Sequence, residues 1–252
     1  MIPAYAEYGD RRNPAILFLH GIRLGREIWA PHAQQLSTRF HVVTLDLPGH
    51  GTLARVPFTQ AAVGELLDRT IDDVCTQPPL IVGYSLGGLV AMQYAARRPE
   101  RTSGLLLAGC TLDFEGWKTW PYEAGARLAE LMPAPVFDAL LGAGVHLTLP
   151  YQWAQLVTRI PFNRDVLSRT SRIAPSMRFS ETIRAYRKPV QFVNGEYDFV
   201  FRIDERRYLQ AVPQARLHVI RGADHTAPLR HVQEFVTAVN DFAGSVYAEA
   251  AP

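Results

Sequence analysis

The feature that most constrains the fold is a series of short apolar runs separated by longer amphipathic stretches. Each run is almost continuously apolar, which is typical of strands buried on both faces of a parallel sheet. The runs are AILFLH (15–20), HVVTLDL (41–47), LIVGYS (80–85), SGLLLAG (103–109), PVQFVNG (189–195) and ARLHVIRG (215–222). Helical patterns fill the gaps at 61–74, 86–98, 201–212 and 228–243. Strands that alternate with helices predict an α/β fold with a mostly parallel central sheet flanked by helices.

One long segment, residues 111–187, interrupts this alternation. It is too long for a single connection between strands, and it is rich in helix-forming and aromatic residues. We therefore predict a helical cap, or lid, over the carboxyl ends of the strands, where open α/β sheets bind their ligands. The remaining residues, 1–110 and 188–252, are predicted to form the core.

A glycine-serine-glycine pattern joins the third apolar run to the helix that follows it. Gly83-Tyr84-Ser85-Leu86-Gly87 matches G-x-S-x-G in a strand-to-helix context. Such a turn strains the backbone of its serine, and flanking glycines let the strand and the helix approach each other. The first N–H groups of the helix point toward developing negative charge. Glycine and serine are also common in ordinary turns, but the flanking strand and helix favour Ser85 as a nucleophile.

A serine hydroxyl needs a base, and His225 is the histidine best placed to supply it. This residue lies between the last predicted strand and the last predicted helix. The carboxyl ends of parallel strands meet at one edge of a sheet, so we expect the imidazole to reach Ser85.

The base in turn needs a carboxylate that fixes its tautomer. Asp198 lies in the loop after the strand at 189–195 and is the leading candidate. Asp113, which follows the strand at 103–109, could also reach the site and stays open as an alternative. Asp224 is less suitable, because a residue rarely turns its side chain back onto the ring of its immediate neighbour.

The loop after the first apolar run, Leu19-His20-Gly21-Ile22-Arg23, provides the last group that acyl transfer requires. Gly21 lets the chain turn so that the N–H of Ile22 joins the N–H of Leu86 in an oxyanion hole. Each such donor stabilises the transition state by roughly 3 kcal/mol. We interpret His20 as a structural histidine that hydrogen-bonds this loop.

Charge and composition exclude several other classes of function. The formal net charge is +2, which indicates neither nucleic acid nor an anionic membrane as a partner. No His/Cys cluster has the spacing of a metal site, and we expect neither a metal nor a cofactor. Cys75 and Cys110 form no C-x-x-C pair, and residues 1–10 show no signal-peptide pattern, which favours the cytoplasm. Lys118 and Lys188 are the only lysines, which suggests a GC-rich bacterial source.

The segments LHGIRLGREIW, LDLPGHG, VGYSLGG, NGEYD and ADHTAP, in this order, resemble the α/β-hydrolase superfamily. More narrowly, they resemble small bacterial members with a helical cap: carboxylesterases of the pimeloyl-ester type, 3-oxoadipate enol-lactonases and meta-cleavage C–C bond hydrolases. The resemblance implies an α/β-hydrolase fold with the cap inserted after the sixth strand. It also implies Ser85 as nucleophile, Asp198 as acid and His225 as base, with oxyanion N–H groups from Ile22 and Leu86.

Two departures narrow the range of reactions within the superfamily. Haloalkane dehalogenases and epoxide hydrolases of this fold use aspartate where this chain has Ser85, so both are excluded. Menaquinone-pathway lyases usually follow GYSLGG with arginine, whereas Leu89 stands here, which counts against a polyanionic substrate of that kind.

Together these residues predict a serine hydrolase that cleaves a carboxylic ester of a small, largely apolar or aromatic substrate through an acyl-enzyme. A lactonase or a C–C bond hydrolase of the meta-cleavage type stays open, because the same three residues serve both. A non-catalytic small-ligand receptor on this fold is a remote alternative. The candidate substrate-binding residues are Arg23, Tyr84, Trp117, Trp120 and Trp153, although the aromatic side chains of the insertion could equally form its own core. The sequence predicts no oligomeric state.

Overall fold

The computed structural model describes residues 3–173 and 178–249 and is built around a seven-stranded sheet. In chain order the strands are β1 (Tyr5–Tyr8), β2 (Ala15–Leu19), β3 (His41–Leu45), β4 (Leu80–Tyr84), β5 (Gly104–Ala108), β6 (Val190–Gly195) and β7 (Arg216–Ile220). Across the sheet they follow the order β1-β3-β2-β4-β5-β6-β7. β1 pairs antiparallel with β3, and the other neighbours are parallel. The predicted mostly parallel α/β fold is therefore confirmed.

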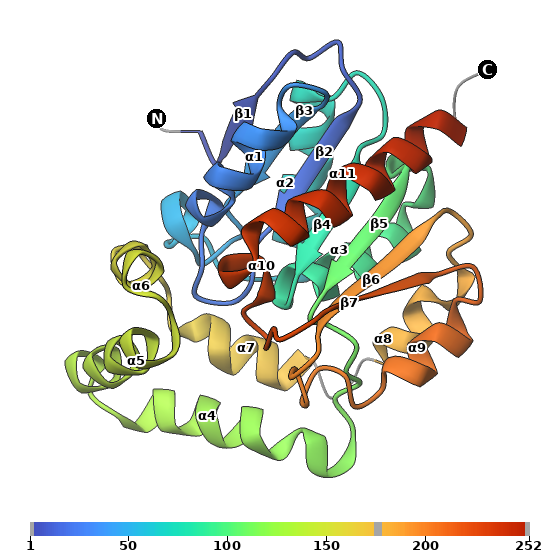
Figure 1. The fold of residues 1–252 in the computed structure, drawn as a ribbon. Helices are drawn as coiled ribbons and strands as arrows, with labels where there is room; N and C mark the ends of the chain where they lie inside the picture. The colour runs from blue at the N-terminus through green and yellow to red at the C-terminus, as the bar shows by residue number, and fades with distance from the viewer. Residues whose placement is uncertain (1–2, 174–177, 250–252) are drawn as a thin grey trace.

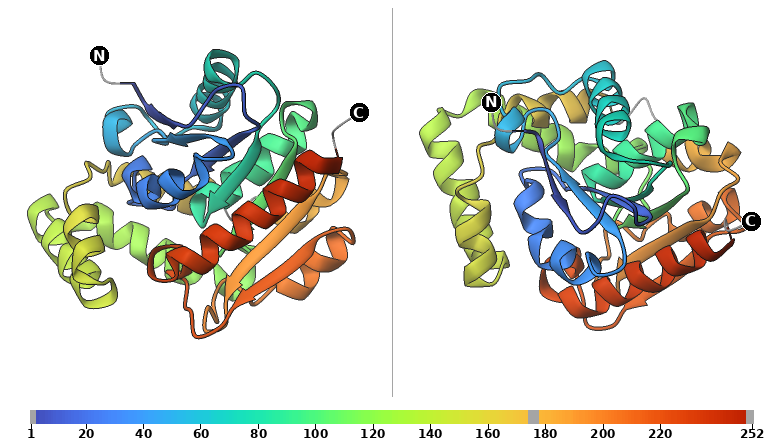
Figure 2. Two further views of the ribbon diagram at one scale, coloured as in Figure 1. Left: turned by 45° about the horizontal axis from the view of Figure 1, so that its top comes forward. Right: turned by 90° about the horizontal axis from the view of Figure 1, so that it is seen from above.

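Helices cover both faces of the sheet, as Figures 1 and 2 show. α1 (Ala30–Leu36) and α11 (Val232–Glu249) pack on one face, whereas α2 (Gln60–Val74), α3 (Leu86–Arg97) and α9 (Glu205–Ala211) pack on the other. Within residues 3–173 and 178–249, no helix combines the length and the hydropathy that a membrane span requires.

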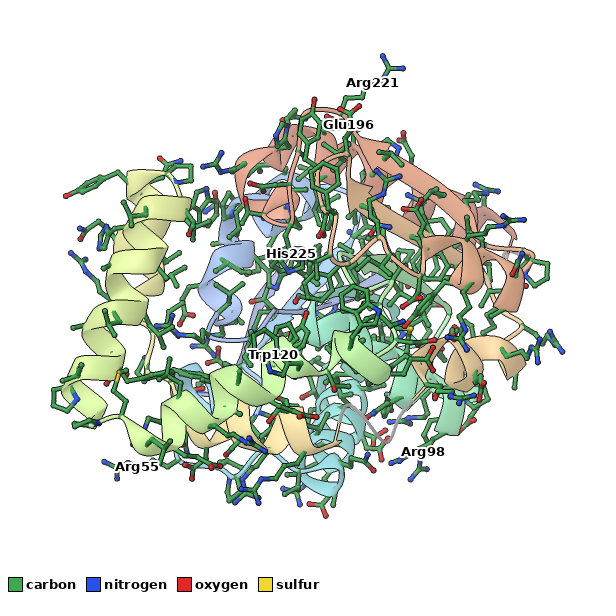
Figure 3. The ribbon with its side chains drawn as sticks, turned by 90° about the horizontal axis from the view of Figure 1, so that it is seen from below. Arg55, Arg98, Trp120, Glu196, Arg221 and His225 are labelled. Atoms are coloured by element: carbon green, nitrogen blue, oxygen red, sulfur yellow. The ribbon has the colours of Figure 1, made fainter. Side chains whose placement is uncertain are left out.

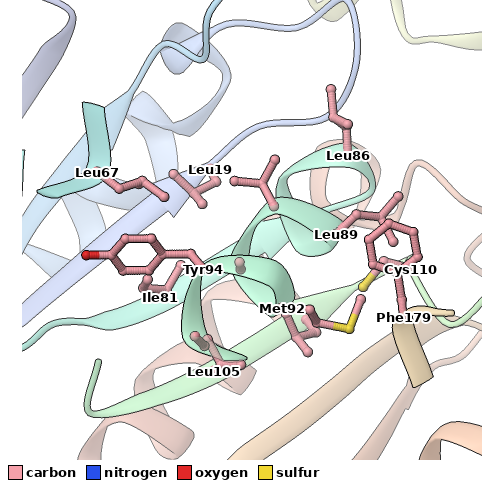
Figure 4. Close-up of a cluster of buried hydrophobic side chains, with 14 of the residues drawn as sticks. Leu19, Leu67, Ile81, Leu86, Leu89, Met92, Tyr94, Leu105, Cys110 and Phe179 are labelled. Carbon is pink, nitrogen blue, oxygen red and sulfur yellow. The ribbon is translucent and has the colours of Figure 1, made fainter. Parts of the chain in front are cut away.

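The central strands are buried along their whole length, as their continuous apolar sequences predict. Successive side chains of a strand point to opposite faces of the sheet. Leu17 and Leu19 of β2 accordingly belong to the core cluster under α2 and α3, while Ile16 and Phe18 belong to the cluster under α1 and α11. Figure 4 shows part of the first cluster, where Leu67 of α2 lies close to Leu19.

The chain between β5 and β6 is helical, as predicted, and residues 111–187 are called the inserted segment below. Its helices are α4 (Trp120–Leu131), α5 (Ala134–Thr148), α6 (Tyr151–Val157), α7 (Asp165–Ile173) and α8 (Phe179–Thr182). Figure 1 shows α4 to α7 gathered at the lower end of the sheet, where the loops after β6 and β7 emerge. The expected position after the sixth strand is wrong by one. In the described chain five strands precede the inserted segment: β1 and the four strands that the sequence predicted, β2 to β5. The segment therefore follows the fifth strand.

Two predicted helices also have different bounds. The helix expected at 201–212 begins only at Glu205, because the preceding residues form turns in which Asp198 Oδ1 accepts a hydrogen bond from Phe201 N (3.1 Å). The helix expected at 228–243 is divided into α10 (Ala227–Arg230) and α11. His231, with φ −116° and ψ 50°, stands at the break.

Candidate active site

Ser85 stands at the sharp turn between β4 and α3. Its backbone has φ 52° and ψ −116°, a left-handed conformation that L-residues rarely adopt. Ser85 N donates to Ala108 O of the neighbouring strand β5 (2.8 Å), which ties the turn to the sheet. The flanking glycines allow close backbone contacts, because a Cβ on Gly87 would lie 2.3 Å from Leu19 O and one on Gly83 would lie 2.6 Å from Gly87 O. These contacts hold the serine hydroxyl at the carboxyl edge of the sheet.

The structure brings His225 and Asp198 together with Ser85. His225 Nδ1 lies 2.8 Å from Asp198 Oδ2, and His225 Nε2 lies 3.2 Å from Ser85 Oγ. The Asp198 side chain is 3 % exposed and that of His225 is 31 % exposed. Because the carboxylate accepts the Nδ1–H, Nε2 is left without a proton and can accept one from the hydroxyl. The three side chains thus have the geometry that a serine nucleophile requires.

Aromatic rings and a glycine fix the position of the His225 imidazole. Phe201 stacks on it, with ring centroids 4.1 Å apart and an interplanar angle of 17°. The ring of Tyr84, which is 4 % exposed, lies 5.3 Å from it. A Cβ on Gly109 would lie 3.0 Å from the imidazole. The sequence did not predict these roles of Phe201 and Gly109. The one signal for them was position, because Gly109 directly follows β5 and Phe201 lies in the loop after β6.

Asp113, the alternative acid, is fully buried and engaged elsewhere. Its carboxylate accepts hydrogen bonds from Ser180 N (3.0 Å), from Ser180 Oγ and from Tyr208 OH (3.1 Å). Arg207 Nη1 lies 3.3 Å from Oδ2. The carboxylate therefore connects the start of the inserted segment to its end and to α9, and it is not the partner of His225.

The amides of Ile22 and Leu86 are the two groups predicted to form the oxyanion hole. Among the hydrogen bonds of the described residues, neither N–H has an acceptor. The Leu86 amide is free because it lies in the first turn of α3, where helical N–H groups have no partner within the helix. The loop that carries Ile22 passes close to the nucleophile, since a Cβ on Gly21 would lie 3.3 Å from Ser85 Cβ.

His20 holds this loop in place, as its structural interpretation predicted. Leu47 N donates to His20 Nε2 (3.0 Å), so the ring proton is on Nδ1, which donates to Gly21 O (2.8 Å). Burial lowers the pKa of His20 to about 4. Burial likewise lowers the pKa of His32 to about 4 and that of His50 to about 3. All three are neutral in the folded protein at neutral pH.

These buried histidines are expected to make the fold sensitive to mild acid. An unfolded histidine binds its proton near pH 6.5, whereas the folded chain binds it only near pH 3 to 4. Stability present above pH 6.5 is therefore lost as the pH falls, by about 2 kcal/mol for each histidine at roughly pH 5. Urea unfolding at about pH 7.5 and about pH 5 measures the loss. His32→Gln should reduce the pH dependence, and a free energy of unfolding that is equal at both pH values would contradict the expectation.

The tryptophans predicted to bind substrate lie in two different environments. Trp153 is 6 % exposed and belongs to the core cluster shared with α1 and α11, so it packs the inserted segment against the core. Trp117 and Trp120 are 74 % and 71 % exposed. Figure 3 shows Trp120 on α4 in the same view from below in which His225 is seen. Contact of any of the three with substrate stays a prediction. The described residues include no group of three or more side chains that could hold a metal ion.

Comparisons with known proteins identify related sequences and folds. A family model described as "Alpha/beta hydrolase family" matches residues 16–238. A pimeloyl-[acyl-carrier protein] methyl ester esterase from Chromobacterium violaceum is 31% identical over 246 residues, which cover 90% of this chain and 93% of that protein. A 2-succinyl-6-hydroxy-2,4-cyclohexadiene-1-carboxylate synthase from Salmonella arizonae is 30% identical over 244 residues, which cover 90% and 92%. A solved carboxylesterase structure from Nitrososphaera gargenis matches with a TM-score of 0.84 and 18% identity over 97% of this chain and 95% of that one, which shows a shared fold.

Proposed function

The chain belongs to the alpha/beta hydrolase family, and from that premise we propose that it is a serine hydrolase that cleaves a carboxylic ester through an acyl-enzyme. The observation that carries the proposal is the relay from Asp198 to His225 to Ser85, with separations of 2.8 and 3.2 Å. The ester hydrolase from Chromobacterium violaceum, at 31% identity, supports the same class of reaction.

Acylation begins when His225 Nε2 takes the proton of the Ser85 hydroxyl and Oγ attacks the ester carbonyl carbon. The carbonyl oxygen becomes an oxyanion, which the N–H groups of Ile22 and Leu86 stabilise. Asp198 stabilises the imidazolium that forms. The bond to the alkoxy group then breaks, the proton on Nε2 passes to the departing oxygen, and the alcohol leaves the acyl group on Oγ.

Deacylation repeats these steps with water as the nucleophile. His225 Nε2 takes a proton from the water while its oxygen attacks the acyl carbon. The same two amides stabilise the second oxyanion. When the bond to Ser85 Oγ breaks, the proton returns to that oxygen, which releases the carboxylic acid and restores the enzyme.

We further propose that one side of the substrate is largely apolar or aromatic. The support is a cavity of about 340 Å³ that runs along α2 and α3 and reaches Leu86, the residue after Ser85. Near Leu86 its lining is apolar, with Leu89, Val90 and Phe179, whereas its other lining residues include the charged Glu65, Asp68, Arg97 and Arg98; neither Ser85 nor His225 lines it. The name of the Chromobacterium violaceum relative supports methyl esters among the candidates, including an ester whose acyl group is attached to an acyl-carrier protein.

A panel of esters, lactones and vinylogous 1,5-diketones tests which reaction the protein catalyses. We expect kcat/KM for aryl and methyl esters of four- to eight-carbon acids to exceed the values for lactones and for vinylogous 1,5-diketones by roughly tenfold or more, a difference of about 1.4 kcal/mol. Faster cleavage of the diketone would instead favour a C–C bond hydrolase. Thermal stabilisation by these compounds with no product would favour a receptor.

A further inference from the structure

Arg23 shares an unusual backbone conformation with the proposed nucleophile. Glycines excepted, Arg23 and Ser85 are the residues in the described chain that have a positive φ, 63° and 52° respectively. Such strain costs an L-residue roughly 1–3 kcal/mol, and it is concentrated at functional sites. A glycine would remove this cost, so an arginine at the position lowers stability and needs another explanation.

The Arg23 side chain is partly buried and lacks a counter-charge at close range. Its Nε is buried with no hydrogen-bond partner. In the part of the chain that the structure describes, it forms no hydrogen bond and no ion pair. Burial lowers the pKa of the guanidinium, and the more distant carboxylate of Asp138 opposes this shift. The guanidinium carbon lies 5.8 Å from the centroid of the Phe162 ring. A partly buried cation without a paired anion is stabilised when an anion binds to it.

The Arg23 backbone belongs to the loop beside Ser85, and its guanidinium faces Phe162 of the inserted segment. Arg23 follows Ile22, the proposed oxyanion donor, and its loop contacts Ser85 through Gly21. The Phe162 ring that lies near the guanidinium and the Asp138 carboxylate whose charge acts on it both belong to the inserted segment. That segment lies at the end of the sheet where the loops after β6 and β7 emerge (Figure 1), and Ser85 directly follows the carboxyl end of β4.

We propose that Arg23 binds a carboxylate on the acyl chain of the substrate, so that the preferred esters carry one anionic group in addition to the ester. This inference rests on the proposed ester hydrolysis. A planar guanidinium can donate two parallel hydrogen bonds to a carboxylate, which fixes the orientation of the acyl chain as well as its charge. The bound carboxylate also supplies the hydrogen-bonded counter-charge that the described residues do not.

Two matched esters test the assignment: the p-nitrophenyl monoester of adipic acid and p-nitrophenyl hexanoate. They share the leaving group and the chain length, and they differ in a terminal carboxylate or methyl group. We expect the wild-type protein to prefer the adipate ester by about tenfold or more in kcat/KM, the equivalent of one charge-assisted hydrogen bond. Arg23→Gln and Arg23→Gly should each reduce this preference by roughly tenfold or more, mainly through a higher KM for the adipate ester.

Arg23→Gly and one further variant separate binding from folding effects. Arg23→Gly accommodates the left-handed backbone without strain, so it should fold at least as stably as the wild type. Arg159→Gln, which removes an exposed arginine of the inserted segment, should keep the wild-type preference. An equal loss on both esters in the Arg23 variants, or no preference in the wild type, would overturn the assignment while leaving the ester hydrolase intact. Absence of Ser85-dependent hydrolysis of both esters would overturn the proposed function together with it.

Discussion

Replacing Ser85 by alanine is expected to lower kcat for ester hydrolysis by about 10⁴- to 10⁶-fold. The substitution removes the proposed nucleophile, Ser85 Oγ, which lies 3.2 Å from His225 Nε2. It keeps the Cβ and the flanking glycine contacts, so the fold should be unchanged. Release of p-nitrophenol from p-nitrophenyl butyrate by the purified variant measures the effect, and circular dichroism checks the fold.

Ser245→Ala is the matched control for this substitution. Ser245 Oγ donates to Phe242 O within α11 (2.8 Å) and has no contact with the relay. Its loss should leave kcat within about twofold of the wild type, because a single intrahelical hydrogen bond contributes little to stability. Equal turnover by Ser85→Ala and Ser245→Ala would show that hydrolysis takes place elsewhere.

Replacing Asp198 by asparagine is expected to lower kcat by about 10⁴-fold. An amide cannot stabilise the imidazolium, and its NH₂ group would face His225 Nδ1 in place of the carboxylate oxygen at 2.8 Å. The ring would then favour the tautomer with a proton on Nε2, which cannot accept the proton of Ser85. The Oδ1 of asparagine can still accept from Phe201 N, so the turn should be retained. Measurement of kcat against pH for the variant and the wild type tests this.

The neighbouring carboxylate of Asp224 provides the control for the Asp198 variant. Asp224 Oδ1 accepts from Thr226 N (2.8 Å) and Thr226 Oγ1 (2.5 Å) and does not face the imidazole. Asp224→Asn should therefore lower kcat by less than about tenfold. A loss as large as that of Asp198→Asn would mean that the two carboxylates act by holding their loops in place and not through His225.

The strands and the residues that follow them were predictable from short-range patterns. The inner parallel strands are near-continuous apolar runs, so their ends could be read from the sequence, whereas the edge strand β7 carries Arg216 and His218 and is only partly buried. The register then aligns Leu19 with Gly83, and Gly195 with Ile220, at one edge of the sheet. Because Ser85, Asp198 and His225 each stand just beyond the end of a parallel strand, the topology of the sheet brings them together.

Other features depend on contacts that sequence patterns do not contain. β1 was missed because it is an antiparallel edge strand with partly buried residues and no continuous apolar run. The role of Asp113 depends on Ser180 and Tyr208, which are distant in sequence. The stacking of Phe201 on His225 required turns where a helical pattern was expected. The strain and the isolation of Arg23 are likewise properties of the folded chain.

Covalent labelling tests the central claim, that Ser85 is the nucleophile of a serine hydrolase, most directly. A fluorophosphonate ester reacts with a serine only where a base and an oxyanion hole activate it, and it forms a stable phosphonyl adduct on Oγ. Mass spectrometry of the digested protein should find one adduct per chain, on the peptide that contains Ser85. Prior denaturation or His225→Ala should abolish the adduct. An unmodified Ser85 peptide in protein that still hydrolyses esters, or an adduct on a different serine, would contradict the account.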